Sequence, residues 1–567
     1  MAVAIGNTEN VELAAHYYLD NFLSLCETVE NQYGDLLNVQ EHAFLKRFYS
    51  LDHSAQCLYV RLISRLGPWF RVGKLTYPEI GDMVQPVQSL LAAQAAVAAT
   101  ELTVAELGRL FTMAEIQSVY RELLPGTLAA GKAGLLAAVD DLALRDEQHL
   151  TLLTEALGEE LIAPADVEVV DLLQILFFGN RHQGLTDFVL SELGIARYYP
   201  YSLNRRHRLF PCREALDEYL YCCEFQDLFY QFLELDDEEG MAATASAMIE
   251  REVCFSVSQR RWQRACNSVA RELERRKHLD LARQLYECSN RHPARERRAR
   301  ILEAKQDWQG VVSLCETIIS SPWCEEEREA AHRILPRIQR KLGGGPVARQ
   351  KDEFREIGLT LQQRCECVEL DAAAHLQKQW ASVYYVENSL MNTLFCLAFW
   401  QQIFADVPGA FHNQYQGAPR DMYDGDFVRS RETEINARLR ALKTGNLREE
   451  LMGAYRRYSG FQCHWADWRT VDDSLLNTAL QAIPAQHLFA IWERQLFDPA
   501  ENRSGFPDLI AFAGPGGGGA DDYCMIEVKG PGDSLQNNQK RWLRYFSEHS
   551  IPAAVAWVEW LVPQPHA

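Results

Sequence analysis

The sequence predicts a multidomain, mainly α-helical protein that ends in a small α/β domain. A chain of 567 residues is too long for a single hydrophobic core. Through most of the first 480 residues, apolar side chains recur at three- and four-residue spacing, which indicates amphipathic helices. Near the C-terminus, two short runs rich in β-forming residues come before one more helical pattern.

Changes in composition divide the chain into four regions, and the clearest boundary is the glycine run at 342–346. The segment Leu58–Ile63 fits either a strand or a helix. We expect a helical N-terminal region, a second helical region, a long helical array, and a C-terminal domain made of a helical lead-in and an α/β core. Their boundaries are 1–95, 96–150, 151–345 and 346–567, with the lead-in at 346–480 and the core at 481–563.

The net charge of −21 is unusual for a partner of nucleic acid, but the charge is unevenly distributed. Residues 259–300 hold 13 Lys and Arg against 5 Asp and Glu, a local charge of +8. Such a basic surface can bind phosphates even on an acidic protein. The alternative is a set of solvated helix faces.

The fifteen cysteines are scattered, with no two pairs at the spacing of a zinc site. We therefore expect reduced thiols. The N-terminus has no basic segment followed by an apolar one, and no apolar run is long enough to cross a membrane. We expect a cytoplasmic or nucleoid location if the protein is bacterial, and a nuclear one if it is eukaryotic.

The most informative stretch is Gly505–Phe546, whose pattern is strand, glycine loop at 515–519, strand, turn and helix. Side chains alternate along a strand, so Glu527 and Lys529 point the same way. Asp508 opens the neighbouring strand, from which it can meet Glu527 across the sheet. Two converging carboxylates both stay ionised at pH 7 only if a cation shares the site. Their hard oxygens favour Mg²⁺ or Mn²⁺ over zinc.

The helix at the end of this stretch is expected to start at Ser534, with Asp533 as its N-cap. Gln539 falls on the face that we expect to be buried, where an amide is costly unless it has a partner or a role. The other members of that face are Leu535, Trp542, Leu543 and Phe546.

The pattern Pro507-Asp508 followed by Glu527-x-Lys529 resembles the PD-(D/E)xK nuclease fold. The longer string GFPDL…EVKGPGDSLQNNQKRWL resembles something narrower, the virus-type replication-repair nuclease domain (VRR-NUC) of the Fanconi-associated nuclease family. The resemblance extends over residues from about 100 to 563 and is strongest after about 380.

This resemblance implies a site for one or two divalent metal ions, with the carboxylates of Glu387, Asp508 and Glu527 as ligands. The Val528 carbonyl is expected to add a further oxygen. Glu387 lies within Gln377–Phe404, an apolar stretch for which we expect a long helix.

The remaining roles also follow from the resemblance. Lys529 is expected to orient or deprotonate the attacking water and to offset negative charge, with Gln539 supporting Lys529 or the water. Asp533 matches an acid in the family's loop, but its role stays open. Arg503, just before the Pro-Asp pair, is a candidate contact to the scissile phosphate. Arg431 is among the candidate phosphate contacts of the lead-in.

Two further segments are expected to contact DNA. The stretch SQRRWQRACNSVAREL resembles the family segment whose arginine holds the 5′-phosphate of a flap. The match supports Arg260 or Arg261 without choosing between them, and Arg264 lies one turn further on.

Residues 100–140 resemble a SAP DNA-binding module that starts with a Thr103–Glu106 capping box, and a plain helical pair is the alternative. Lys132 is the candidate phosphate contact of this module. Residues 214–341 suggest tetratricopeptide-like helical pairs, a candidate surface for a protein partner.

The resemblance therefore implies a structure-specific DNA nuclease that cuts 5′ flaps, degrades DNA in the 5′-to-3′ direction and acts in interstrand crosslink repair. Its expected partner is branched DNA with a 5′-phosphate. One alternative is a non-catalytic repair scaffold that binds DNA and protein through its repeats. Another, ranked last, is a restriction-type endonuclease. The complete set of acids and Lys529 favour the nuclease, because a scaffold does not need them. The sequence leaves the oligomeric state open.

Overall fold

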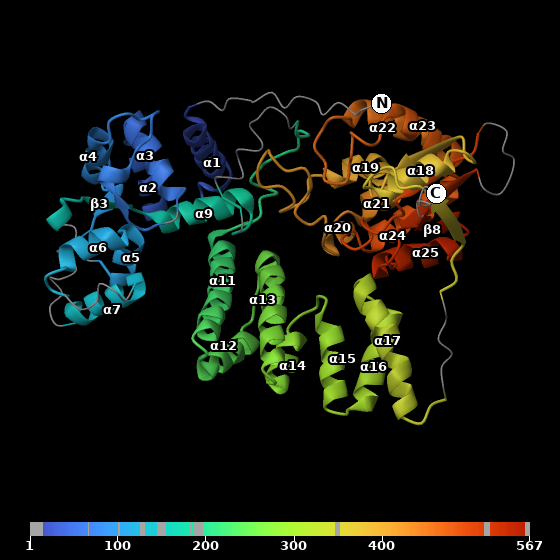
Figure 1. Cartoon of the computed structure of the whole chain (residues 1–567), viewed down its shortest axis with the longest axis horizontal. Helices are drawn as coiled ribbons and strands as arrows, with labels where there is room; N and C mark the ends of the chain where they lie inside the picture. Colours follow the sequence, from blue (N-terminus) through green and yellow to red (C-terminus); the bar gives the residue numbers. More distant parts are fainter. Residues whose placement is uncertain are drawn as a thin grey trace, which may run out of the picture. The chain divides into compact units, whose positions relative to one another are not determined.

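The computed structural model describes residues 15–65, 67–99, 102–124, 131–144, 155–181, 183–184, 197–345, 352–514 and 522–561. The chain forms two compact units, Met1–Ala196 and Arg197–Ala567 (Figure 1). The expected glycine loop at 515–519 lies outside the described residues. Among the helices that are described, none is long and apolar enough to cross a membrane.

The first unit is a set of helices packed around a small antiparallel sheet with strand order β1-β3-β2. The segment Leu58–Ile63, which the sequence left open, is helical. The helices are α1 (Tyr17–Tyr33), α2 (Val39–Ser50), α3 (His53–Ile63), η1 (Val72–Lys74), α4 (Val84–Ala92), α5 (Val104–Leu110), α6 (Met113–Tyr120), α7 (Gly131–Ala143) and α9 (Val167–Phe178). The strands are β1 (Phe70–Arg71), β2 (Ala96–Ala98) and β3 (Leu161–Pro164).

The expected capping box at the start of α5 is present, because Thr103 accepts from the Glu106 amide while Glu106 accepts from the Thr103 amide. A second capping box, Thr112 with Glu115, starts α6. The Lys132 ammonium donates to the carbonyl of Phe111, 2.8 Å away, and so ties α7 to the end of α5. That contact is a structural role for Lys132, whose role as a phosphate contact stays a prediction.

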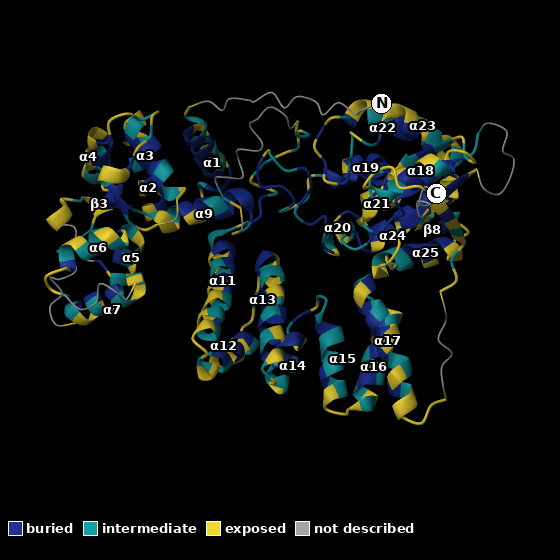
Figure 2. Ribbon diagram, viewed as in Figure 1, coloured by how far each residue is buried: buried dark blue, intermediate teal, exposed yellow. Residues whose placement is uncertain are grey.

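The second unit begins with the expected helical array, in which each helix packs against the next. Each helix buries one stripe of side chains and exposes the opposite one (Figure 2). The helices are α11 (Arg213–Glu234), α12 (Glu238–Glu250), α13 (Ser256–Arg275), α14 (Leu279–Glu287), α15 (Ala294–Ala304), α16 (Trp308–Ser320) and α17 (Glu325–Lys341).

The unit ends in an α/β domain built on a five-stranded mixed sheet of order β4-β8-β7-β6-β5. Strands β4, β8 and β7 are parallel, whereas β7, β6 and β5 are antiparallel. The strands are β4 (Glu356–Leu361), β5 (Ser382–Tyr385), β6 (Leu509–Phe512), β7 (Tyr523–Lys529) and β8 (Ala553–Trp560). The helices are α18 (Val368–Leu376), α19 (Leu390–Ile403), α20 (Asp426–Arg429), α21 (Glu432–Thr444), α22 (Leu447–Tyr458), α23 (Asp473–Ala482), α24 (Ala485–Phe497) and α25 (Asn537–Glu548).

Both faces of the central strands are covered. Along β7, Tyr523 and Met525 pack with α19, α24 and α25, whereas Cys524, Ile526 and Val528 pack against α18. Because strand side chains alternate, Glu527 and Lys529 share the face of Tyr523 and Met525. This strand is buried along its whole length, so the two charged groups lie at the end of a hydrophobic core.

The long helix expected over Gln377–Phe404 is wrong for its first half. Ser382–Tyr385 is instead the edge strand β5, since its β-branched and aromatic residues pair with β6. Asn388 then adopts a left-handed backbone with φ +53, which breaks any helix, and α19 begins at Leu390. Glu387 therefore lies in an exposed turn rather than on an apolar helix face.

The helix start expected at Ser534 is also wrong. Helix α25 begins at Asn537, and its N-cap is Gln536. The Asp533 carboxylate instead accepts a hydrogen bond from the amide of Gly530, 2.9 Å away, which closes the turn after β7. Asp533 was chosen as a cap by residue type alone, and a turn that ends a strand uses the same type.

Replacing Gly505 with alanine is expected to loosen the loop that carries Asp508. Gly505 has φ +87, and a Cβ there would lie 2.8 Å from a backbone carbon of Asn538 in α25. The left-handed backbone costs alanine about 1–2 kcal/mol, and this overlap adds to it. The matched control is Gly532→Ala, where φ is +91 but nothing lies within 4 Å of a Cβ.

Hydrogen exchange of residues 503–509 measures the effect directly, because a multidomain chain has no single unfolding free energy. Exchange is expected to rise in Gly505→Ala and to stay unchanged in Gly532→Ala. No change in Gly505→Ala would mean that the close approach to α25 does not hold the loop.

Candidate active site and arginine cluster

Three strand ends bring the predicted acids into one region. The antiparallel register pairs Leu509 with Ile526, which places Asp508 opposite Glu527 as the sequence predicted. The amide of Val386, at the end of β5, donates to the carbonyl of Asp508 at 2.8 Å, so the turn that carries Glu387 starts beside Asp508.

Glu527 is the most deeply buried of these acids, with 1% of its surface exposed. Nζ of Lys529 lies 2.9 Å from its Oε1 and forms an ion pair with it. Among the described residues, neither carboxylate oxygen has a well-aligned hydrogen-bond donor. Burial, and then the charge of Asp508, raise the pKa of Glu527 to about 8, against the opposing effect of Lys529. The single ammonium of Lys529 therefore offsets only part of the cost of burying this carboxylate.

Asp508 is held from the opposite strand. Its Oδ2 accepts a hydrogen bond from the amide of Val528 at 2.8 Å. Burial raises the pKa of Asp508 to about 6, and the nearby charge of Glu387 adds to the increase. The Val528 amide fixes where this carboxylate points, while the role of the Val528 carbonyl stays a prediction.

Glu387 approaches from the exposed turn. Its Oε2 accepts from the Tyr385 hydroxyl at 2.8 Å and its Oε1 from Nδ2 of Asn388 at 3.2 Å. It is close enough to raise the pKa of both Asp508 and Glu527. Oxygens of the three acids do not all lie within 4.8 Å of one another, so at least one of the side chains must move for them to share an ion.

The donor set fits a hard divalent cation. All three side chains offer carboxylate oxygens, the type of ligand that Mg²⁺ and Mn²⁺ take, and no His or Cys lies in the set. The buried oxygens of Glu527 that lack aligned donors are the observation that tests this fit, because a cation would supply the missing partner.

The spacing between the Pro-Asp pair and Trp542 has a structural explanation. Phe506 stacks on Trp542 with ring centroids 4.1 Å apart, and the Trp542 indole N–H donates to the carbonyl of Ser504 at 3.1 Å. The close approach of Gly505 to Asn538 completes the contact. Helix α25 therefore positions the loop that leads into Asp508.

A polar network that sequence reasoning missed joins the Glu387 turn to this loop. Nδ2 of Asn392 donates to the carbonyls of Asn388 and Arg503, at 2.6 and 2.8 Å. Gln495 donates to Asn392 Oδ1 at 2.9 Å, and the Phe506 amide donates to Asn388 Oδ1 at 3.2 Å. The only sequence signal was three amides in apolar surroundings.

Gln539 is only half-buried, and its contact differs from the predicted one. Its side-chain oxygen accepts from the amide of Gln536 at 2.9 Å, as part of a capping box at the start of α25. Among the described residues, the Gln539 side chain makes no hydrogen bond to Lys529. The predicted support of Lys529 or its water by Gln539 therefore stays a prediction.

Beside the acids lies a cavity of about 300 Å³ whose walls include Glu387, Asn388, His464, Asp467 and Arg503. The Arg503 side chain is exposed and its guanidinium lies 4.7 Å from the centre of the Tyr423 ring. This position, next to Glu387, is compatible with the predicted contact to a phosphate.

In contrast, Arg431 is unavailable to a phosphate. It is fully buried in an ion pair with Asp421, with Nη1 and Oδ2 2.7 Å apart.

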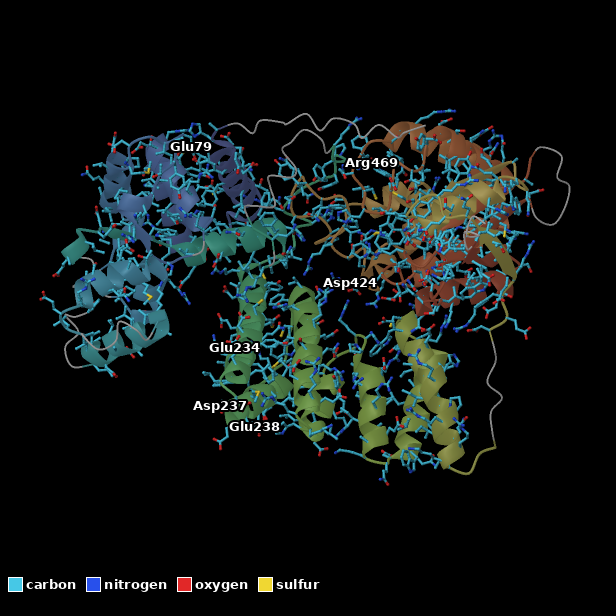
Figure 3. All side chains as sticks on the ribbon, viewed as in Figure 1. Glu79, Glu234, Asp237, Glu238, Asp424 and Arg469 are labelled. Carbon is cyan, nitrogen blue, oxygen red and sulfur yellow. The ribbon has the colours of Figure 1, made fainter. Side chains whose placement is uncertain are left out.

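The basic segment converges on one buried acid, Asp424, which is labelled in Figure 3. Arg264 and Arg291 both donate to its Oδ1, at 2.9 Å for Arg264. Arg260 lies 3.2 Å from Asp424 and 2.7 Å from Asp426. Burial lowers the pKa of Arg420, and the positive charges of Arg260 and Arg264 lower it further.

We call Arg260, Arg264, Arg291 and Arg420 the arginine cluster. Arg260, Arg264 and Arg291 pair with Asp424 or Asp426, and Arg429 also pairs with Asp426. Arg420 is near enough for their charges to act on it, so positive charge exceeds negative charge among these groups. The guanidinium of Arg420 has no carboxylate partner among the described residues. Arg261 is half-buried and outside this group, and its Nε has no partner in the described part of the chain. Sequence reasoning missed Arg291 and Arg420, since only the fold brings them to α13.

In the presence of a chelator, the stability of the α/β domain is expected to fall as the pH rises from about 6 to about 8. The pKa values of Asp508 and Glu527 are raised to about 6 and about 8 in the folded state. In the unfolded chain both groups titrate near about pH 4. The folded state therefore binds more protons across this range, and its stability falls as they are lost.

Hydrogen exchange of strands β6 and β7 in full-length protein, corrected for the intrinsic exchange rate at each pH, measures this dependence. Glu527→Gln is expected to flatten the profile above pH 6, whereas Glu559→Gln, an exposed acid on β8, leaves it unchanged. A wild-type profile that is flat or rises would contradict the proposed strain between the two acids.

Comparison with known proteins agrees with this architecture. The family model described as "FAN1, HTH domain" matches residues 16–96, and the model "VRR-NUC domain" matches residues 442–560. A crystal structure of paFAN1 bound to 2nt 5′ flap DNA with gap superimposes with a TM-score of 0.81 at 34% identity, and covers 98% of this chain and 100% of that one. A second crystal structure, of paFAN1 bound to 1nt 5′ flap DNA with gap, superimposes on this chain with a TM-score of 0.79.

Relatives in other organisms extend over nearly the whole chain. A Fanconi-associated nuclease 1 homolog from Pseudomonas aeruginosa is 34% identical over 549 residues, which is 96% of each chain. A homolog from Oryza sativa subsp. japonica is 24% identical over 608 residues, 95% of this chain and 62% of the rice protein. The fold, the VRR-NUC match and this full-length identity confirm the resemblance seen in the sequence: the chain belongs to the Fanconi-associated nuclease family.

Proposed function

We propose that this chain cuts DNA at 5′ flaps, with Mg²⁺ or Mn²⁺ as its cofactor, and also degrades DNA in the 5′-to-3′ direction. Its family is one of structure-specific DNA nucleases, and interstrand crosslink repair is the process in which we expect it to act. The observation that carries the proposal is the buried pair Asp508 and Glu527, with Lys529 2.9 Å from Glu527, at the end of a mixed sheet.

Glu387, Asp508 and Glu527, with the Val528 carbonyl, are the groups that we propose to hold the metal. When bound, one or two such ions activate a water, neutralise charge on the phosphate and stabilise the leaving oxygen. The protein's part is to supply fixed oxygens at one edge of a rigid sheet. Protons compete for the two buried acids, because their pKa values are raised, so metal affinity is expected to increase between pH 6 and 8.

Lys529 has a separate role in the proposal. Its ammonium reaches the same edge as Glu527, from which it orients or deprotonates the attacking water and offsets negative charge in the transition state. The alternation of β7 places it on the same face as Glu527. Arg503, in the neighbouring cavity, is proposed to hold the scissile phosphate.

The arginine cluster is proposed to bind the 5′-phosphate of the flap. Guanidinium groups match phosphate oxygens in a bidentate manner, and the excess of positive charge leaves the cluster able to accept an anion. Asp424 and Asp426 are proposed to hold the guanidinium groups in place until a phosphate binds. The similar paFAN1 structures, which are bound to 5′ flap DNA, support a flap as the substrate.

The first test measures cleavage of a labelled 5′ flap, a blunt duplex and a plasmid, each with Mg²⁺, Mn²⁺ or EDTA. Flap cleavage is expected to require metal and to fall by at least about 100-fold in Asp508→Asn and in Lys529→Ala, because charge stabilisation of this kind is worth that much. Glu559→Gln keeps full activity. Flap binding without cleavage would favour a scaffold, and discrete plasmid fragments would favour a restriction-type enzyme.

The second test compares flaps that end in a 5′-phosphate with flaps that end in a 5′-hydroxyl. Arg260→Ala is expected to weaken cleavage of the phosphorylated flap by about 10- to 100-fold, the value of a charged hydrogen bond, with little effect on the hydroxyl flap. The control is Arg275→Ala, which changes an exposed arginine of the same helix whose one ion pair among the described residues is with Glu272. An equal loss on both flaps would show that Arg260 does not contact the phosphate.

A further inference from the structure

A cluster of nitrogen and sulfur ligands lies in the first unit, among residues for which neither the sequence nor the proposed function has a role. Sγ of Cys57 is 3.5 Å from Nδ1 of His16 and 3.8 Å from Nδ1 of His53. The two imidazole rings meet edge to face, with centroids 4.7 Å apart. Within the described part of the chain, this is the one group of three His, Cys, Asp or Glu side chains whose ligand atoms all lie within 4.8 Å.

These spacings are those of a tetrahedral metal site. A zinc ion binds sulfur at about 2.3 Å and imidazole nitrogen at about 2.0 Å, and tetrahedral angles then place the two ligand atoms about 3.5 Å apart. The distances from Cys57 to the two histidines match this value within a few tenths of an ångström. A metal-free thiol can instead donate to one imidazole and accept from the other, and a thiolate-to-metal absorption band distinguishes the two arrangements.

The local structure presents the ligands toward one point. His53 and Cys57 are four residues apart on α3, so they lie on the same face one turn apart. His16 is the N-cap residue of α1, a position that favours Ser, Thr, Asp or Asn, and its side chain makes no capping hydrogen bond. Its ring faces Cys57 instead, which joins the start of α1 to α3.

The charges around the cluster can accommodate a cation. Two helix N-termini are unfavourable for positive charge, since the helix dipole is positive there. Asp52, the N-cap of α3, and Asp20, in the first turn of α1, offset this. The charge of Glu79 also acts on Cys57, but Glu79 is paired with Arg61, whose charge acts in the opposite sense. The Tyr18 hydroxyl is within hydrogen-bonding reach of the sulfur and donates to Glu79 at 3.2 Å.

We propose that His16, His53 and Cys57 bind one zinc ion, with water in the fourth position, and that this ion fastens the start of α1 to α3. The site is distinct in chemistry from the carboxylates of the candidate active site, because imidazole and thiolate are borderline-soft ligands that select Zn²⁺ over Mg²⁺. His53 is exposed, so the ion can reach the site from solvent. Binding would stabilise the first unit without taking part in DNA cleavage.

The test uses Co²⁺ as a spectroscopic substitute for zinc in full-length protein freed of metal with a chelator. One equivalent of Co²⁺ is expected to produce a thiolate-to-cobalt charge-transfer band and the intense visible bands of tetrahedral cobalt, and Zn²⁺ is expected to displace it. Cobalt at the active-site carboxylates cannot produce the thiolate band. Cys57→Ser is expected to abolish the band, and His53→Ala to weaken Co²⁺ affinity by at least about 10-fold, the least that losing a supporting partner usually costs.

One control variant and one additional ligand variant complete the test. Cys367→Ser changes a half-buried thiol of the second unit that lies beside an acid, Glu369, and is expected to leave the spectrum unchanged. His53→Ala replaces an exposed side chain, so it tests the site even if Cys57→Ser fails to fold. Absence of the band in the wild-type protein, its survival in Cys57→Ser, or an unchanged affinity in His53→Ala would each overturn the proposal.

Discussion

Two buried carboxylates, Asp508 and Glu527, face each other across the antiparallel strands β6 and β7, and every other group of the candidate active site takes its place from that register. A slip of one residue would turn Glu527 and Lys529 to the opposite face, where α18 covers the sheet. Keeping both acids ionised while buried is unfavourable unless a cation shares the space. The Lys529 ammonium supplies part of the positive charge that the two carboxylates need. It does not balance both of them, so the pKa values of Asp508 and Glu527 stay raised.

The surrounding fold holds these groups in place from outside the sheet. Helix α25 packs Trp542 on Phe506 and so carries the loop that precedes Asp508. The amides of Asn388, Asn392 and Gln495 connect that loop to the turn that bears Glu387. Glu387 is the most exposed of the three acids, so it is the proposed ligand whose side chain is least held by the fold. The site thus combines two fixed carboxylates with one adjustable one.

The arginine cluster resolves the conflict between a net charge of −21 and a nucleic-acid partner. Arg260, Arg264 and Arg291 are gathered around Asp424, whose side chain is 6% exposed, and Arg420 adds a further charge. If a phosphate binds at this cluster, as proposed, it meets this local excess at short range, whereas the acidic remainder of the chain acts over longer distances that salt screens. The aspartates also keep the guanidinium groups ordered before any ligand arrives.

The sequence by itself determined the helical array, the strand pair around Asp508 and Glu527, and the common face of Glu527 and Lys529, because these depend on the period of nearby residues. It failed where a residue type suits two local structures: Glu387 follows an edge strand rather than lying on a helix, and Asp533 closes a turn rather than capping α25. Only the tertiary structure decided which arginines surround Asp424 and brought His16 within 3.5 Å of Cys57. Such contacts join residues at least 41 positions apart, and no local pattern encodes them, since they arise from how separate elements pack.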